Sequence, residues 1–147
     1  MWMGTPIPPE LGVFPGYLLA RLGETSRRRF AEVMEPTGLD GRHFRVLATV
    51  AARPGLTQQQ LHEKTSIDPS SMVAVIDELE THGFAERRQD PDDGRARTIY
   101  LTPTGERFER RITRQATELQ DELLAVLSEP ERATLHALLR KLTGVEA

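Results

Sequence analysis

The segment from Asp90 to Thr102 constrains the fold of this chain more than any other part of its 147-residue sequence. Its Asp93-Gly94 pair is favoured at the tip of a two-residue hairpin, because both residue types tolerate a positive φ. The flanking residues predict two short strands, 84–88 and 97–101. A short basic hairpin with Arg95 at its tip suits the narrow, electronegative minor groove of DNA. On the hairpin alone, a solvated surface turn is an equally good interpretation.

Apolar side chains recur at helical spacing on both sides of this hairpin, and helix start signals precede each run. The gap at 65–68 fits the turn of a helix-turn-helix. We therefore predict a fold that is mainly α with a small β-hairpin wing, a winged helix-turn-helix flanked by N- and C-terminal helices. The predicted helices cover 15–35, 40–52, 57–64, 68–82, 102–127 and 130–142.

The flanking helical segments, 11–36 and 103–147, are amphipathic and enclose a winged helix-turn-helix lobe at 39–101. Between Phe108 and Val126 the apolar residues are spaced by three and four, and a leucine-rich helix follows. A seam of this kind more often packs against another subunit than stands alone. We expect one domain, 1–147, whose flanking helices form a homodimer.

Composition excludes several classes of protein. The chain has no cysteine, which rules out disulfides and thiolate metal sites. Its four histidines lack metal-ligand spacing, and the sequence shows no phosphate loop or catalytic signature, so we expect no metal, no cofactor and no enzyme activity. No apolar run is long enough to span a membrane, and no secretory signal precedes the first helix. The expected location is the cytoplasm.

Four segments together resemble the MarR family of bacterial transcriptional regulators, over about residues 11–142. The resemblance implies a sequence-specific DNA-binding regulator, most often a repressor, that binds a pseudo-palindromic operator as a homodimer. Members are frequently released from DNA by a small aromatic or phenolic ligand. The matching segments are Pro54–Leu61, Ile67–Met72, Leu79–Phe84 and Arg88–Gly105.

The resemblance also assigns the residues that contact DNA. Ser70 and Ser71 begin the recognition helix, where simple helix capping is the alternative role. The start of the preceding helix suits a phosphate group because of its exposed N–H groups. In the wing, Arg95 matches the arginine that enters the minor groove and Asp93 the aspartate that orients it. The further candidates for DNA contact are Thr57, Gln58, Gln59, Arg88 and Arg97.

The recognition helix departs from the family pattern. Val73 and Ala74 stand where many members have serine and arginine, and Glu78 replaces another arginine. The two apolar side chains can pack against thymine methyl groups, whereas Glu78 would repel phosphate. With a formal net charge of −3, these departures favour an alternative, a winged-helix dimer that has lost specific DNA binding and serves as a protein-interaction module. The Asp93 and Arg95 pair opposes it.

The resemblance also implies an effector site. By analogy with the family, its pocket lies between the dimerisation helices and the DNA-binding lobe, and includes Tyr17, Arg21, His43 and Phe44. His43 could hydrogen-bond a carboxylate or phenol, but a histidine satisfied within the fold is the stronger interpretation.

Overall fold

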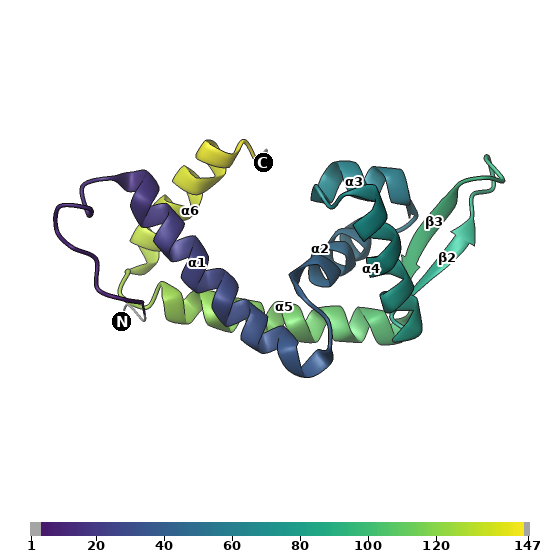
Figure 1. Ribbon diagram of the computed structural model, residues 1–147, viewed down its shortest axis with the longest axis horizontal. Coiled ribbons are helices and arrows are strands. Elements are labelled where there is room, and N and C mark those ends of the chain that lie inside the picture. Colours follow the sequence, from purple (N-terminus) through teal and green to yellow (C-terminus); the bar gives the residue numbers. More distant parts are fainter. Residues whose placement is uncertain (1–3, 146–147) are drawn as a thin grey trace. The chain divides into compact units, whose positions relative to one another are not determined.

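The computed structural model describes residues 4–145, and its elements are shown in Figure 1. The predicted class is confirmed: six α-helices accompany a small antiparallel sheet. The elements in chain order are α1 (Pro15–Met34), the 3-10 turn η1 (Glu35–Thr37), α2 (Gly41–Ala52), β1 (Leu56–Thr57), α3 (Gln58–Thr65), α4 (Pro69–Thr81), β2 (Ala85–Gln89), β3 (Arg97–Leu101), α5 (Pro103–Leu123) and α6 (Glu129–Thr143).

The chain forms two compact units, and the boundary between them falls inside α1 and α5. One unit covers Phe30–Ala116, which includes the whole predicted lobe. The other comprises the chain up to Arg29 and from Thr117 onward.

The core of the unit 30–116 forms between α2, α3, α4 and the sheet (Figure 1). On α4, apolar side chains at Met72, Val75, Ile76 and Leu79 follow the i, i+3, i+4, i+7 pattern, and all four are buried. Phe84 stacks on Phe108 at 4.3 Å between ring centroids, which packs the first part of α5 against the segment that leads into β2. The other buried apolar residues are Met34, Leu39, Val46, Leu47, Val50, Leu61, Ile67, Ala85, Ile99 and Ile112.

Helix starts follow the predicted caps. The side chains of Asp40 and Thr57 accept hydrogen bonds from the N–H groups of Arg42 and Gln60, respectively. The N–H of each cap residue donates in return to the side chain of the third helical residue, His43 or Gln60, which forms a capping box. Asp68 accepts from the N–H of Ser71, and Pro69 occupies the first position of α4. These satisfied N–H groups define where α2, α3 and α4 begin.

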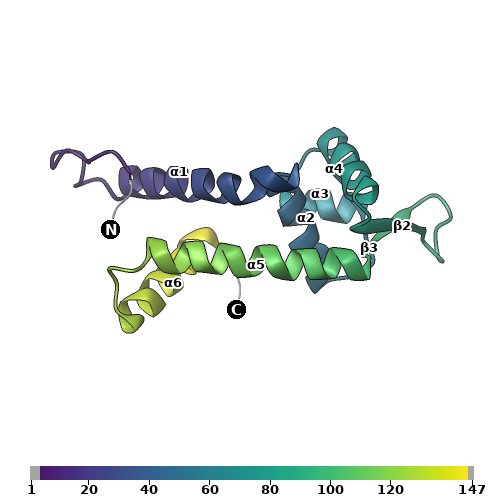
Figure 2. The same ribbon diagram turned by 90° about the horizontal axis from the view of Figure 1, so that it is seen from below.

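The wing contains one strand more than we predicted. β1 pairs antiparallel with β3, placing Leu56 opposite Ile99, so the sheet has three strands in the order β1-β3-β2. Between β2 and β3 the register runs from Ala85 opposite Leu101 to Gln89 opposite Arg97. The β2–β3 hairpin extends away from the helices of this unit (Figure 2).

The predicted two-residue turn at Asp93-Gly94 is wrong. The last paired residues are Gln89 and Arg97, so the loop spans Asp90–Ala96. The N–H of Asp90 donates to the carbonyl of Ala96, and the N–H of Ala96 donates to the carbonyl of Asp93. Among the described residues neither Asp93 nor Gly94 has a positive φ, so the pair does not form the expected primed turn.

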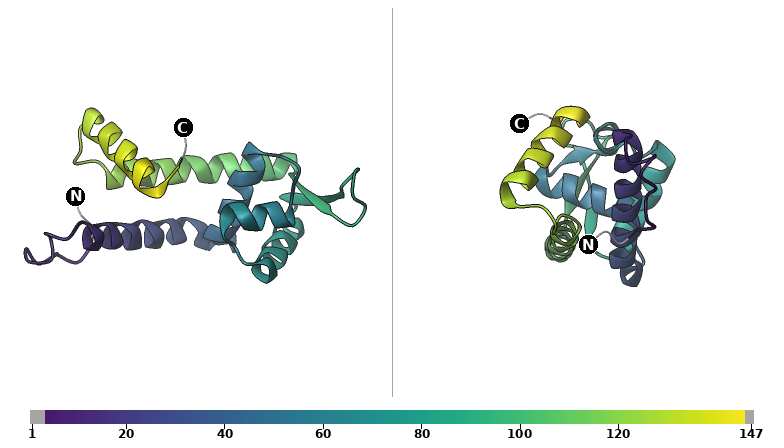
Figure 3. Two further views of the ribbon diagram at one scale, coloured as in Figure 1. Left: turned by 90° about the horizontal axis from the view of Figure 1, so that it is seen from above. Right: turned by 90° about the vertical axis from the view of Figure 1, so that its left-hand side faces the viewer.

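The unit outside 30–116 contains α6, the C-terminal part of α5 and most of α1. The chain turns back from the end of α5 into α6 (Figure 3). α5 ends at Leu123, earlier than the predicted Leu127, because the chain tightens into turns there. The N–H of Ala125 donates to the carbonyl of Glu122, and that of Leu127 to Leu124.

Candidate nucleic-acid interface

The N-terminus of α4 gathers the two serines that we predicted to contact DNA. Asp68 is the cap residue, and it accepts hydrogen bonds from the N–H of Ser71 at 2.9 Å and from the hydroxyl of Ser70 at 2.7 Å. Hydrogen bonds from Ser71 and Ser70 hold the pKa of the Asp68 carboxyl below its ordinary value. The serines therefore start the helix beside a fixed carboxylate.

The outward face of α4 continues through Val73 and Ala74. Both residues are exposed, and 45% of Val73 is accessible, on the side of the helix opposite the buried stripe. A large apolar side chain held in water costs free energy that contact with an apolar group recovers. This face therefore fits partners such as thymine methyl groups.

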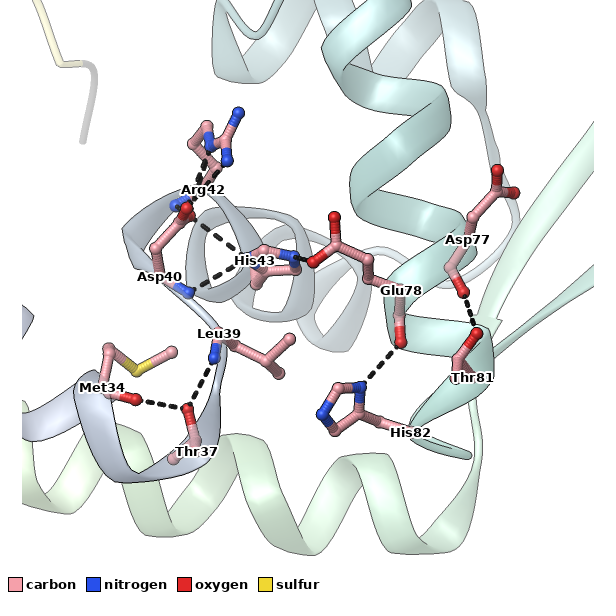
Figure 4. A network of polar contacts seen from close by, with 10 residues as sticks. All are labelled: Met34, Thr37, Leu39, Asp40, Arg42, His43, Asp77, Glu78, Thr81 and His82. Atoms are coloured by element: carbon pink, nitrogen blue, oxygen red, sulfur yellow. Dashed lines mark hydrogen bonds and ion pairs between the residues drawn. The ribbon is translucent and has the colours of Figure 1, made fainter.

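The side chain of Glu78, on the same helix, is hydrogen-bonded to α2. Its Oε2 lies 3.0 Å from Nε2 of His43, a residue of α2 that is only 2% exposed (Figure 4). The N–H of Asp40 donates to Nδ1 of His43 at 3.0 Å, so in the neutral ring the proton sits on Nε2 and is donated to Glu78. The carboxylate that we expected to oppose phosphate is thus hydrogen-bonded to another helix.

The start of α3 holds the other helical candidates. The Thr57 hydroxyl accepts from the N–H of Gln60 at 3.1 Å, so it serves as the cap. The side-chain amide of Gln59 donates to Glu63 at 3.2 Å. Oε1 of Gln58 accepts from Nε of Arg87 at 2.8 Å. Capping and DNA contact are compatible at this helix end, because the amide groups of the glutamines keep further donors.

The wing loop sets Arg95 apart from its neighbours. Oδ1 of Asp93 accepts from the main-chain N–H of Arg95 at 3.0 Å, and within residues 4–145 no contact links this carboxylate to the guanidinium. The Arg88 guanidinium lies 3.9 Å from the centroid of the Tyr100 ring and is paired with Glu86. Arg97 reaches the carbonyl of Gly94 at 3.5 Å. Arg95 is the exposed cation of the loop with its guanidinium unpaired in the described chain.

Sequence reasoning overlooked Arg87 as an interface residue. It lies on β2, and its side chain reaches both α3 and α4. Its partners belong to other elements, from Glu80, seven positions away, to Gln58, 29 positions away, so no pattern within β2 identifies it.

The candidate effector residues fall in both units. Tyr17 and Arg21 pair with each other at 3.0 Å, and Arg21 also donates to the carbonyl of Thr5 at 2.9 Å. Phe44 packs on Phe30 with 5.2 Å between ring centroids, while His43 is occupied as described above. One cavity, of about 300 Å³, lies in the unit outside 30–116 and is lined by Gly4, Thr5, Arg21, Glu24, Thr25 and Arg28.

Across residues 4–145, no group of three or more histidine and carboxylate side chains is arranged to hold a metal ion. In the same part of the chain, no helix is long and apolar enough to cross a membrane.

Comparison with known proteins identifies the family. The model of the MarR family matches residues 37–96. A putative transcriptional regulatory protein for the hcr operon of Thauera aromatica is 33% identical over 128 residues, which covers 86% of this chain and 77% of the relative. The chain belongs to the MarR family. An HTH-type transcriptional repressor of Mycobacterium tuberculosis is 29% identical over 86% of this chain and 91% of its own length.

Solved structures of the family include DNA complexes. The transcriptional repressor CouR bound to a 23-mer DNA duplex matches with a TM-score of 0.82 and 28% identity, over 95% of this chain and 99% of the other. Wild-type MarR from Escherichia coli matches with a TM-score of 0.76 and 26% identity, over 94% and 98%. MarR-family proteins are DNA-binding regulators and not enzymes, so the prediction of a non-enzymatic transcriptional regulator is confirmed by membership of the family.

Proposed function

We propose that this MarR-family regulator is a repressor that binds a pseudo-palindromic operator as a homodimer. The observation that carries the proposal is the exposed guanidinium of Arg95, which has no partner among residues 4–145, on a hairpin that extends beyond the recognition helix. An arginine without an internal partner needs no bond broken before it enters a groove. The repressor names of several relatives and the CouR duplex complex support the same function.

The proposed contacts follow the geometry of each element. α4 enters the major groove, where Val73 and Ala74 meet thymine methyl groups and Ser70 and Ser71 meet base edges or phosphates. The wing places Arg95 in the adjacent minor groove, positioned by Asp93 through the loop main chain. Phosphate contacts come from Thr57, Gln58 and Gln59 at the start of α3 and from Arg88 and Arg97 on the wing strands.

The homodimer is proposed to form through segments 11–36 and 103–147, leaving 39–101 as the DNA-binding lobe of a single cytoplasmic domain. Its support is the apolar surface that one chain leaves in water, which includes Val126 at 75% and Leu142 at 73% exposure. A small aromatic effector would release the DNA. The support for ligand binding is PcaV of Streptomyces coelicolor, a transcriptional regulator that is 26% identical and was solved in complex with its natural ligand.

Selection from a random duplex library tests this function. The full chain is incubated with 40-bp duplexes that contain a random central region, and bound DNA is sequenced over successive rounds. We expect enrichment of two half-sites related by a dyad, with centres about 10 bp apart. Arg95→Ala protein serves as the control and should enrich the same site weakly. If the wild-type protein enriches no sequence, the interaction-module alternative is the better account.

A further inference from the structure

The recognition helix of this chain carries carboxylates and no basic residue. Its sequence from Pro69 to Thr81 contains Asp77, Glu78 and Glu80, without lysine or arginine. Asp77 follows Val73 by four positions and Ala74 by three, so it lies on their outward face, with 60% of its side chain exposed. Negatively charged groups on a face that meets DNA phosphates oppose binding, because like charges repel. The structure must therefore offset these charges locally if the helix binds DNA.

Arg87 supplies the offset from the neighbouring strand β2. Its Nη1 lies 2.8 Å from Oδ1 of Asp77 and is also paired with Glu80. Nη2 donates to the carbonyl of Val73 at 3.4 Å, and Nε donates to Oε1 of Gln58 at 2.8 Å. One guanidinium thus bonds α3, α4 and β2 together. We call this set of contacts the Arg87 clamp.

Burial and geometry distinguish the clamp from an exposed arginine. Only 19% of the Arg87 side chain is exposed, and the contacts engage all three guanidinium nitrogens. The planar guanidinium offers several donors in a fixed fork, which suits simultaneous bonds to different elements. To reach a phosphate, Arg87 would have to leave two carboxylates unpaired.

We propose that Arg87 is a positioning residue for DNA recognition: it screens Asp77 and Glu80 on the recognition helix and fixes that helix to the wing. The inference rests on the proposed DNA-binding function and deepens it. With the clamp in place, the three ionised groups sum to one negative charge, whereas without Arg87 two negative charges face the DNA. The third carboxylate of α4, that of Glu78, is hydrogen-bonded to His43 and not to Arg87.

The clamp also orients a predicted phosphate contact. Because Oε1 of Gln58 accepts from Arg87, the remaining polar group of this side chain is its amide NH2, a donor. A donor at the start of α3 is the group that a phosphate oxygen requires. Loss of Arg87 would free the amide to rotate.

A double-mutant cycle on DNA affinity tests the inference. The proteins are wild type, Arg87→Ala, Asp77→Asn with Glu80→Gln, and the triple variant. Each is titrated with the duplex that the wild-type protein selects, at several salt concentrations. We expect Arg87→Ala to weaken binding about tenfold. Neutralising the two carboxylates should restore most of this loss in the Arg87→Ala protein.

Arg88→Ala is the matched control, because it removes the same charge from the next residue of the same strand. Its loss of affinity should show no such coupling to Asp77 and Glu80. The salt dependence gives a second measure: a lost phosphate contact lowers the slope of log K against log salt by about 0.9. For Arg87→Ala we expect a much smaller change. Arg87→Lys keeps the charge that screens Asp77 and Glu80 but lacks the planar fork that bonds α3 and α4, so its affinity should lie between those of the wild-type and Arg87→Ala proteins.

The outcomes separate the two proposals. Equal effects of the carboxylate substitutions with and without Arg87, together with a slope change near 0.9, would show a direct phosphate contact and overturn the clamp. Failure of wild-type protein to bind any duplex overturns the proposed function before a variant is compared. If Arg87→Ala does not fold, as judged by circular dichroism, Arg87→Lys with and without the carboxylate substitutions provides the cycle, and loss of the lysine variant's binding contradicts the screening role.

Discussion

The arginines of the wing differ in their bonding partners within the protein, and this difference indicates which of them is available to bind DNA. Arg87 is bonded to α3 and α4, Arg88 stacks on Tyr100, and Arg97 contacts the loop main chain. Arg95 is exposed with its guanidinium unpaired within residues 4–145. A side chain that is already bonded loses those bonds when it turns to DNA, whereas Arg95 loses none. Affinity should therefore depend more on Arg95 than on Arg97.

Replacement of Arg95 by alanine should weaken operator binding by about 1–3 kcal/mol, because the wing loses its minor-groove cation. Fluorescence anisotropy with a labelled selected duplex at fixed salt measures the change. Arg27→Ala removes an exposed arginine of α1, outside the lobe, and should leave the affinity unchanged. Equal binding by the Arg95→Ala and wild-type proteins would make the hairpin a surface feature only.

The lowered pKa of the Asp40 carboxyl makes the stability of the fold depend on pH in acid. The hydrogen bond from the Arg42 side chain lowers the pKa of the Asp40 carboxyl below its ordinary value of 3.8, and the N–H of Arg42 adds to this. A carboxyl whose pKa is lower in the folded state stabilises the fold while ionised, above about pH 4. That contribution disappears as the pH falls through the folded-state pKa. Half of the side chain is exposed, so solvent screens much of the effect.

Two substitutions at Asp40 separate charge from capping. Asn also caps helices well, so Asp40→Asn should lower the free energy of unfolding by less than about 1 kcal/mol at pH 7 and progressively less below pH 4. Asp40→Ala also loses the cap, so a deficit of about 1 kcal/mol should persist in acid. Urea unfolding at pH 3 to 7 measures both. A constant difference for Asp40→Asn across this range would contradict the charge argument.

At the scale of elements, local sequence signals predicted the helices. They did not predict a strand whose partner lies far away in the sequence. The capping signals at Asp40, Thr57 and Asp68 each involve residues at most three positions apart. The structure confirms all three helix starts. β1 was missed because its two residues also serve as the approach to α3 and pair with Ile99 and Thr98, far along the chain. Strand pairing at that separation leaves no local pattern.

In the candidate interface, too, features set by local sequence were predicted and contacts between elements were not. Exposure of Val73 and Ala74 followed from helical periodicity, and both are exposed in the structure. The bond of Glu78 to His43 and the contacts of Arg87 could not be predicted, since each joins elements whose packing only the folded chain defines. The turn at Asp93-Gly94 was wrong because residue preference does not fix loop length when a seven-residue loop closes the same strands.

The close approach of α5 to the main chain of Phe84, the residue before β2, requires glycine at position 105. A Cβ added there would lie 1.8 Å from the carbonyl oxygen of Phe84, which is backbone and cannot move alone. Gly105→Ala should therefore destabilise the fold by at least about 2 kcal/mol. At Gly23, in the middle of α1, an added Cβ meets nothing within 4 Å, so Gly23→Ala should stabilise by up to about 1 kcal/mol. Thermal unfolding of both variants tests the contrast; equal Tm values would refute it.

At the scale of the whole molecule, the apolar surface is unevenly distributed. The unit 30–116 buries a continuous core, whereas α6 has no buried residue. Leu138 and Leu142 on α6 are 54% and 73% exposed and lie four positions apart on one face. Side chains of this size each gain about 1.5–3 kcal/mol when they are fully buried. A second copy of the chain is the partner that the homodimer proposal assigns to this face.

Substituting Leu138 and Leu142 by glutamate should convert a dimer into a monomer. The wild-type chain of 16.5 kDa should sediment at about twice that mass at micromolar concentration. In the Leu138→Glu, Leu142→Glu protein, loss of about 3 kcal/mol of apolar burial would raise the dissociation constant at least 100-fold. Circular dichroism should stay unchanged, because both side chains are exposed in the single chain. His136→Glu adds a charge at another exposed position of α6 and should remain dimeric. A wild-type monomer, or an unaffected double variant, would show that this face does not join two copies.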